Sequence, residues 1–441
     1  MSRPSPTPLI FIILVYLALA GAYALRTPAW QAPDEPAHYN YIAQTAESGC
    51  CPVIASGDWD AEYLDRLKES RFAPTLLDEL PAVQYEDHQP PLYYLLLSPI
   101  YALTGGSLFA LRLVTIMIGL TIVIYAYILT WLILPKYPGA ALGAAALVAV
   151  LPQFLAITAS VNNDALSWSL IGLALIGVVT YLYGESRDLR TEIMIGIIVG
   201  LALLTKLNAL FLLGVVPLAI VLKWREKWRS IPLRAGAFLL PALALAGLWW
   251  ARNLAVYGVP DIFGLAAHDR VVVGQLRTAS LIAEVGTAEY TWRALTTTFQ
   301  SFFGQFGWMA LPLPAWIYAG IALLLLGALA GWLWRRPHSD SDDPALHPGR
   351  QRIARGMMAV VLLLALAQYA YYNTEFVQFQ GRYLYTGLLP FAALTAAGLD
   401  RLMIGAGGAH RYSHLWFVGL LSPLILLNIW VLWRVLPALA P

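Results

Sequence analysis

WQAPDEPAHYNY, residues 30–41, places two adjacent carboxylates, Asp34 and Glu35, soon after the first long apolar run of the chain. Pro33 and Pro36 flank this pair. Proline fixes its own φ and favours an extended conformation in the residue before it, so the sequence predicts a stiff, non-helical turn. Such a turn can aim a carboxylate, but the same residues would also suit a helix end that faces water. The rest of the chain has to decide between these two interpretations.

The composition is that of a polytopic membrane protein. Of the 441 residues, 59% are hydrophobic and only 12% are charged, whereas about 25% are charged in a typical soluble domain. The net charge of +2 is too small to predict a nucleic-acid partner. Cys50 and Cys51 are adjacent, a spacing that suits neither a metal site nor a redox motif, and we assign them no role.

The order of apolar runs predicts a topology. Residues 9–25 nearly supply the roughly 20 apolar residues that a spanning helix needs, and Arg3 before them indicates a cytoplasmic N-terminus. Counting onward predicts about eleven spanning helices and puts the basic segment KWREKWR, residues 223–229, in the cytoplasm. We therefore predict an all-α fold, one polytopic domain over residues 1–441, in the inner (plasma) membrane of the cell. The turn with Asp34 and Glu35 is expected on the periplasmic or extracellular side.

Three segments are expected outside the membrane. Residues 26–107 should form a long first outer loop with surface-lying helices, because the apolar run from Leu92 to Leu103 is only about 12 residues long and contains Pro99. A second long outer loop is expected at residues 257–310. The polar, proline-containing residues 335–352 predict a flexible cytoplasmic loop.

The predicted topology gathers polar clusters at the outer face. A transporter or lipid flippase would be expected to show two related halves and ionisable residues near the bilayer midplane, which this sequence does not show. An enzyme is therefore favoured, although a transporter, a flippase or a non-catalytic scaffold protein stays open as an alternative. The clusters are Asp34 with Glu35, Glu86 to His88, Asn162 to Asp164, and Lys206.

The sequence also resembles a known superfamily. WQAPDEPAHY is similar to the WQPDExxxY stretch that follows the first helix of lipid A aminoarabinose transferases and, more loosely, of protein O-mannosyltransferases. Both are GT-C glycosyltransferases that use polyprenyl-phosphate-sugar donors. HQPPLYY, NNDAL, LLTKLN and GRYLYTGLLPFAAL resemble later segments of these enzymes in the same order, although His88 and Gln89 replace the lysine that precedes the proline in the aminoarabinose enzymes. Bacterial membrane proteins with NND and QGRY segments, assigned to the same superfamily, are similar as well.

The resemblance implies a GT-C bundle that transfers a sugar, with inversion, from a polyprenyl-phosphate-linked donor to a glycan, lipid or protein acceptor. It implies that Asp34 acts as the base and that Glu35 supports it or holds the acceptor. Cationic side chains would hold the departing phosphate. By the same resemblance, Lys206, Arg382 and Tyr383 would contact the donor phosphate, and Tyr39, Glu86, His88, Asn163 and Asp164 would contact the acceptor or sugar.

Simpler roles are also open for several of these residues. Lys206 would suit a snorkelling helix end, Arg382 a loop counter-ion, His88 a turn cap and Asp164 a helix start. No cofactor is expected to be required. A carboxylate set would suit only a hard divalent cation, and the sequence has no His/Cys spacing typical of zinc.

Overall fold

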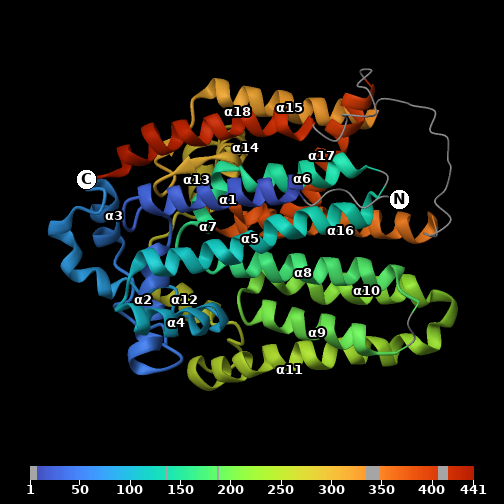
Figure 1. Cartoon of the computed structure of the whole chain (residues 1–441). Helices are drawn as coiled ribbons and strands as arrows, with labels where there is room; N and C mark the ends of the chain where they lie inside the picture. Colours follow the sequence, from blue (N-terminus) through green and yellow to red (C-terminus); the bar gives the residue numbers. More distant parts are fainter. Residues whose placement is uncertain (1–6, 136, 186–187, 334–347, 406–415) are drawn as a thin grey trace.

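The computed structural model describes residues 7–135, 137–185, 188–333, 348–405 and 416–441. In this part of the chain, long helices run side by side and shorter helices gather at one end (Figure 1). The single sheet found there pairs β1 (Gln305–Phe306) with β2 (Leu311–Pro312) in antiparallel fashion. We define the site end of the bundle as the end that carries α2 (Glu35–Ser48) and α4 (Leu92–Thr104), and the basic end as the one that carries η3 (Arg225–Ser230).

The prediction of an all-α polytopic membrane protein is confirmed. Within the described residues, seven helical stretches are long and apolar enough to cross a membrane, or eight if the bent pair α6 (Pro138–Ala149) and α7 (Pro152–Thr158) forms one span. This count does not confirm the prediction of about eleven spans. The stretches contain α1 (Thr7–Arg26), α5 (Leu108–Ile133), α8 (Asp164–Tyr183), the helices within Leu207–Tyr257, α15 (Ala315–Leu333), α16 (Pro348–Glu375) and the helices within Trp416–Leu439.

One of these stretches holds two helices. Lys227 leaves the helical φ/ψ region, and α10 (Leu212–Trp224) and α11 (Ile231–Tyr257) lie on either side of it. Figure 1 shows α10 and α11 as separate rods that meet at the basic end. Two further helices pack within the bundle: α9 (Arg190–Leu203) lies against α11, and α17 (Leu388–Gly405) lies against α6 and α15.

Small residues allow α15 and α17 to approach closely. A Cβ atom added at Gly331 would lie 1.8 Å from the carbonyl oxygen of Gly398, and one added at Gly398 would lie 2.2 Å from that of Ala328. Lipid tails are as apolar as leucine, so helices in a membrane associate largely through such close packing. Glycine at these positions is therefore required for this helix pair.

The structure corrects one predicted helix. The sequence predicts one continuous span over about residues 139–160, but α6 and α7 meet at 59°. Pro152 lacks the N–H that would continue the helix, and it disfavours the α conformation in Leu151, which has φ −69° and ψ 114°. The bend precedes Val161 and Asn163, which take part in the site.

The predicted outer loops are largely helical. Residues 26–107 contain α2, α3 (Ala61–Glu69), η1 (Pro74–Ala82) and α4, and α4 is shorter than a span, as the sequence predicts. The predicted cytoplasmic loop 335–352 lies mostly outside the described residues, and its last residues, 348–352, begin α16. Cys50 and Cys51 are joined to each other. The remaining elements are η2 (Leu207–Phe211), α12 (Leu265–Val271), α13 (Thr278–Val285), α14 (Thr287–Phe303), η4 (Gly381–Gly387), α18 (Trp416–Trp430), η6 (Val431–Val435) and η7 (Leu436–Leu439).

Two small apolar cores at the site end hold α2 in place. One core packs Ala37 of α2 against residues of α3 and η1, including Leu67 and Leu80. The other packs Tyr41 and Ile42 of α2 against α4, α5 and α8. Because α2 is fixed on both sides, the turn that precedes it is fixed as well.

Sidedness can be tested with single cysteines in a variant in which Cys50 and Cys51 are replaced by serine. Glu62 and Lys227 are both exposed and lie at opposite ends of the bundle. We expect Glu62→Cys to react with a membrane-impermeant maleimide on intact cells, because the basic segment around Lys227 should stay in the cytoplasm. Lys227→Cys should react only after permeabilisation. The opposite labelling pattern would place the site end in the cytoplasm.

Candidate active site

The Asp34 turn (residues 30–34) precedes α2. The prediction of a non-helical conformation is wrong for Glu35, which begins α2 with Pro36 in its first turn. Asp34 lies at φ 66° and ψ −3°, in the left-handed region that few residues other than glycine, asparagine and aspartate adopt. The hydroxyl of Tyr85 donates a hydrogen bond of 2.9 Å to Asp34 Oδ1, and the guanidinium of Arg382 donates to Oδ2. The Asp34 side chain is nevertheless 21% exposed, while that of Arg382 is 3% exposed. The carboxylate is thus held from two sides and open on another.

Two carboxyl groups of the site have well-separated pKa values. Burial is the largest single influence and opposes ionisation of Asp34, but several opposing influences, led by the charge of Arg382 and including the hydrogen bonds from Arg382 and Tyr85, together lower the pKa of Asp34 to about 2. Burial raises the pKa of Glu86, and the negative charge of Asp34 adds to this, so that the pKa of Glu86 is about 7. Neighbouring carboxyl groups with pKa values far apart are typical of sites that move a proton, because one is ionised while the other can be neutral.

A chain of alternating charges joins segments that are far apart in sequence. Lys206 Nζ donates hydrogen bonds of 2.6 Å to Asp164 Oδ1 and 3.0 Å to Asn163 Oδ1. Asp164 Oδ2 lies 3.7 Å from Nη1 of Arg382. The Nη2 atom of the same guanidinium binds Asp34 Oδ2. We call Asp34, Arg382, Asp164 and Lys206 the charge network. The structure therefore brings together four residues that the sequence analysis selected.

Part of the Arg382 guanidinium is unused. Its Nε and Nη1 atoms donate no hydrogen bond to any residue that the structure describes, and Asp164 Oδ2 accepts none. A buried donor without a partner costs free energy, unless a ligand supplies the acceptor. Nε and Nη1 lie on different edges of the guanidinium, so each can give one charge-assisted hydrogen bond to an oxygen of an anion. The charge network is therefore suited to take up an anion with several oxygens.

Glu35 points away from the open side of Asp34, into the protein. Arg112 of α5 binds it through two hydrogen bonds, Nε to Oε1 at 2.8 Å and Nη2 to Oε2 at 2.6 Å. The backbone N–H groups of Trp30 and Val161 each donate to it at 3.1 Å. Glu35 has no exposed surface. This geometry favours support of the Asp34 turn over contact with an acceptor as the role of Glu35.

The predicted acceptor or sugar residues lie in different places. Glu86 is half-buried near Asp34, and its Oε2 atom has no hydrogen-bond partner among the described residues. His88 is buried, with Nδ1 3.1 Å from the carbonyl oxygen of Tyr85 and its ring 4.4 Å from that of His268. Asn163 is completely buried and donates from Nδ2 to the hydroxyl of Tyr94 at 3.3 Å.

Two predicted residues form the borders of the site. The hydroxyl of Tyr39 donates to the carbonyl oxygen of Gly106 at 2.7 Å, and its ring packs against Trp30 and Tyr101. This hydroxyl therefore braces the turn between α4 and α5, away from Asp34. Tyr383 follows Arg382 and is half-buried, with its ring 5.8 Å from that of Tyr372.

Sequence reasoning did not select three residues that contact the site. Arg112 could have been found, because a lone arginine in an apolar run normally has a partner. His38 lies one helical turn after Asp34, where its Nδ1 is 2.9 Å from the hydroxyl of Tyr94. Burial and the charge of Lys206 lower the pKa of His38 to about 3, so it is neutral. Tyr85 gave no signal in the sequence, since its contact with Asp34 depends on the fold.

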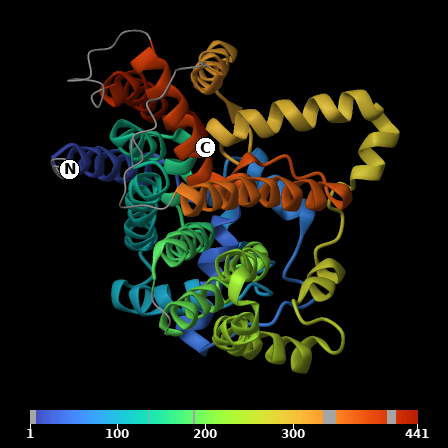
Figure 2. The ribbon, with the colours of Figure 1, turned by 90° about the vertical axis from the view of Figure 1, so that its right-hand side faces the viewer.

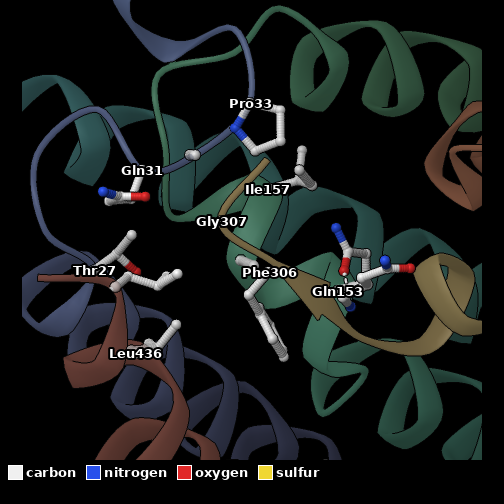
Figure 3. A pocket seen from close by; sticks show the side chains of 12 residues that line it. Thr27, Gln31, Pro33, Gln153, Ile157, Phe306, Gly307 and Leu436 are labelled. Carbon is white, nitrogen blue, oxygen red and sulfur yellow. Dashed lines mark hydrogen bonds between the residues drawn. The ribbon is translucent and has the colours of Figure 1, made fainter. Parts of the chain in front are cut away.

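A small cavity lies behind the Asp34 turn. It has a volume of about 20 Å³, enough for about one water molecule and too small for a sugar. Its walls come from the turn, α7, β1 and η7, and Figure 3 shows Pro33, Gln153 and Phe306 around it. None of the residues of the charge network lines it. This cavity is therefore distinct from the open side of Asp34.

The described part of the chain contains no cluster of potential metal ligands. No group of three or more His, Cys, Asp or Glu side chains there is arranged to hold a metal ion. The expectation that no cofactor is required stays a prediction.

The fold is similar to that of membrane proteins of known structure. The structure of ArnT from Cupriavidus metallidurans bound to undecaprenyl phosphate is similar, with a TM-score of 0.56 and 15% identity over 99% of this chain and 74% of that chain. The apo structure of the same protein gives a TM-score of 0.54 at 15% identity, over 98% of this chain and 73% of that one. The oligosaccharyltransferase of Archaeoglobus fulgidus in complex with Zn and sulfate gives 0.49 at 12% identity, over 95% and 52%. At 15% identity the similarity to the two ArnT structures shows the fold alone, and the chain is a polytopic membrane protein with the GT-C fold.

The sequence places the chain within a particular family. Residues 78–395 match the family described as "Predicted membrane protein (DUF2142)", and the chain belongs to this family. None of the curated proteins compared with it matches in sequence.

The ion pair between Glu35 and Arg112 should matter mainly for stability. We expect Glu35→Gln to lower the free energy of unfolding by about 3–5 kcal/mol, because it leaves a buried guanidinium without its counter-charge. Thermal unfolding of the purified protein in detergent would measure the loss. The matched control is Glu62→Gln, which breaks an exposed pair with Arg66 and should change stability little. Equal melting temperatures for both variants would show that the buried pair does not hold the turn.

Proposed function

We propose that this protein transfers a sugar from a polyprenyl-phosphate-linked donor to an acceptor hydroxyl. The charge network is the observation that supports this proposal best, because it places a partly open carboxylate beside two cations, one of which, Arg382, has unused donors. The shared fold adds support, since one similar structure was solved with undecaprenyl phosphate bound. The proposed site faces the periplasm or the outside of the cell.

The proposed reaction needs a carboxylate and cations. The acceptor oxygen attacks the anomeric carbon of the sugar, and the bond between that carbon and the phosphate oxygen breaks with inversion. The electron pair leaves with the polyprenyl phosphate, and the proton of the acceptor hydroxyl passes to a carboxylate. Arg382 and Lys206 stabilise the charge that grows on the departing phosphate. Tyr383 lies beside Arg382 and completes this donor side.

Donor binding changes the environment of Asp34. Without a ligand, Arg382 lowers the pKa of Asp34 to about 2, which makes this carboxylate a weak base. When phosphate oxygens take donors of Arg382, they weaken its hold on Asp34, and the pKa of Asp34 returns toward its ordinary range. The carboxylate then accepts a proton more readily. Donor and acceptor chemistry are thereby linked through one guanidinium.

Glu86 is the second carboxyl group that can take part. Its pKa of about 7 lies close to neutral pH, where a general base is most effective. In our proposal Asp34 orients or deprotonates the acceptor hydroxyl, and Glu86 contacts the acceptor or the sugar. Asn163, Asp164 and His88 belong to the surrounding wall.

Lys206 offers a direct test of donor binding. Lys206→Met keeps the apolar stem and removes the charge, so donor affinity should fall by roughly 1.5–3 kcal/mol, the contribution of a charge-assisted hydrogen bond. Binding of a polyprenyl-phosphate sugar to purified protein is the measurement. Lys68→Met, at a half-buried position of α3 outside the charge network, is the control and should bind as wild type does. Unchanged affinity in Lys206→Met would assign Lys206 to pairing with Asp164 alone.

Asp34 is the residue on which the proposed chemistry depends. Asp34→Asn keeps the shape of the side chain and should lower turnover by about 10²- to 10⁴-fold, the usual contribution of a general base, while donor binding stays nearly intact. The measurement is release of polyprenyl phosphate from its sugar conjugate in the presence of acceptor.

Glu86→Gln is the matched comparison in the same assay. A larger loss in Glu86→Gln than in Asp34→Asn would assign the proton to Glu86 instead. A transporter would move its substrate without breaking the sugar-phosphate bond, so the absence of product from the wild-type protein across a panel of donors would count against sugar transfer.

A further inference from the structure

α14 lies across the site end, between the ends of two spanning helices. Near its start, the hydroxyl of Tyr290 donates to the carbonyl oxygen of Asn373 in the last turns of α16, at 3.0 Å. Just beyond its end, the carbonyl oxygen of Gly304 accepts from Tyr318 in the first turn of α15, at 2.7 Å. In Figure 2 the long yellow helix runs lengthwise across the view, whereas several green spanning helices are seen nearly end-on. α14 therefore runs across the direction of these spanning helices.

The surface of α14 is divided into three stripes by the 3.6-residue period. Ala288, Trp292 and Leu295 form an exposed apolar stripe, in which Trp292 is 64% and Leu295 is 65% exposed. A stripe that faces the protein contains Tyr290 and Ser301, which contact α16 and the segment before η4. This separation of apolar and polar exposed faces is typical of helices that lie in a membrane interface. The polar stripe contains Glu289 and Arg293, which are exposed, and Thr296, which is half-buried, and Arg293 Nε donates to Glu289 Oε1 at 2.7 Å.

Exposed aromatic residues also lie at the ends of the two spanning helices that α14 connects. Trp316 stands in the first turn of α15, and Tyr371 stands in the last turns of α16, and both are largely exposed. Tryptophan and tyrosine concentrate where a spanning helix leaves the hydrocarbon. Further along α15, Leu323 and Leu326 are exposed too, as expected of a helix face that contacts lipid. The exposed apolar stripe of α14 thus belongs to a helix whose neighbours α15 and α16 also expose apolar and aromatic residues.

α14 is also in direct contact with the segment that carries Arg382. Ser301 Oγ accepts the N–H of Gly381 at 2.8 Å and lies 3.0 Å from the carbonyl oxygen of Phe379. A Cβ atom at Gly381 would lie 2.4 Å from the backbone of Thr298 and Phe302. No side chain fits between them, so the position of α14 sets the position of the residue before Arg382.

We propose that α14 is a lipid-contacting arm: Trp292 and Leu295 enter the leaflet at the site end, Arg293 stays among the headgroups, and the arm thereby fixes the height of Arg382. The occupant of the apolar stripe is the surrounding lipid, because α14 contacts α16 and α15 at its two ends and these helices expose Tyr371 and Trp316 there. The lipid contact stands independently of the reaction. The benefit of fixing Arg382 rests on the proposed function, in which this arginine meets a phosphate at the membrane surface.

Accessibility of single nitroxide labels tests the lipid contact. Cysteines replace Trp292, Leu295, Glu289 or Arg293 one at a time in full-length protein that carries serine at positions 50 and 51. The labelled protein is placed in vesicles of phosphatidylcholine and phosphatidylglycerol. Collision rates are then measured with oxygen, which concentrates in lipid, and with a nickel chelate, which stays in water.

The two stripes should give opposite results. At positions 292 and 295, the ratio of the oxygen to the nickel collision rate should be several-fold higher than at positions 289 and 293. High nickel accessibility at all four positions would overturn the proposal, because the arm would then lie in water. Low accessibility to both reagents at positions 292 and 295 would also overturn it, since a protein partner or a second copy would then cover the stripe.

The effect on Arg382 needs a second measurement. In vesicles, Trp292→Ser combined with Leu295→Ser should raise the KM for the lipid-linked donor, whereas in detergent, which has no leaflet, KM should match that of wild type. Glu289→Ser combined with Thr296→Ser is the control, because both residues lie on the polar stripe of α14. An equal rise of KM in both media would show a general distortion of the site and overturn the coupling. Lipid contact without any sugar-transfer activity in the wild type would refute the proposed function and leave the arm in place.

Discussion

The site depends on one buried ion pair, between Glu35 and Arg112. Burial of two charges is expensive unless their remaining donors and acceptors are satisfied. Here Arg112 also donates to the carbonyl oxygens of Ala24 and Thr27, at 2.9 and 2.8 Å, and Glu35 accepts from Trp30 and Val161. The pair therefore joins the end of α1, the start of α2, α5 and the loop after α7. Its first consequence is directional: with Glu35 fixed inward, the preceding carboxylate has to point the other way.

Charge balance explains how the open side of the site stays folded without a ligand. Two acids and two bases alternate in the charge network, so each charge has an opposite neighbour. An incoming phosphate would add negative charge and compete with Asp34 and Asp164 for the same cations. In the proposed reaction, this competition releases a carboxylate when a proton acceptor is needed. The resting ion pairs would thus hold the base inactive until the donor has bound.

Much of this arrangement could be predicted from local sequence, and the rest could not. The flanking prolines correctly predicted a turn at Asp34 but not the helical conformation of Glu35, and the order of the polar segments led to the GT-C fold. Residue types alone could not show which of two adjacent carboxylates faces inward, because that depends on Arg112, 77 positions further along the chain. Pro152 was a visible signal for the break between α6 and α7. The contact of Tyr85 with Asp34 arises only from packing, so no local pattern could predict it.

The count of spans shows the same limit. Hydropathy and the positive-inside rule rest on length and charge, and both are informative for long helices such as α5 and α8. They are less informative for α9, which has 14 residues, and for α10 and α11, which meet at a short basic turn. The composition of the segments therefore predicted the class of fold. Which short or bent segments count as spanning helices depends on three-dimensional packing.

The order of the charge network along the chain has a consequence for biosynthesis. Asp34 and Asp164 emerge from the ribosome before Lys206, and Arg382 follows when most of the helices have already been made. Domains form from the N-terminus onward during synthesis, so the early bundle carries an excess of acid at this end. The last of the four charges neutralises it. A nascent or truncated chain that stops before η4 would lack the guanidinium that holds Asp34, and the complete site would exist only in a chain inserted at least as far as α17.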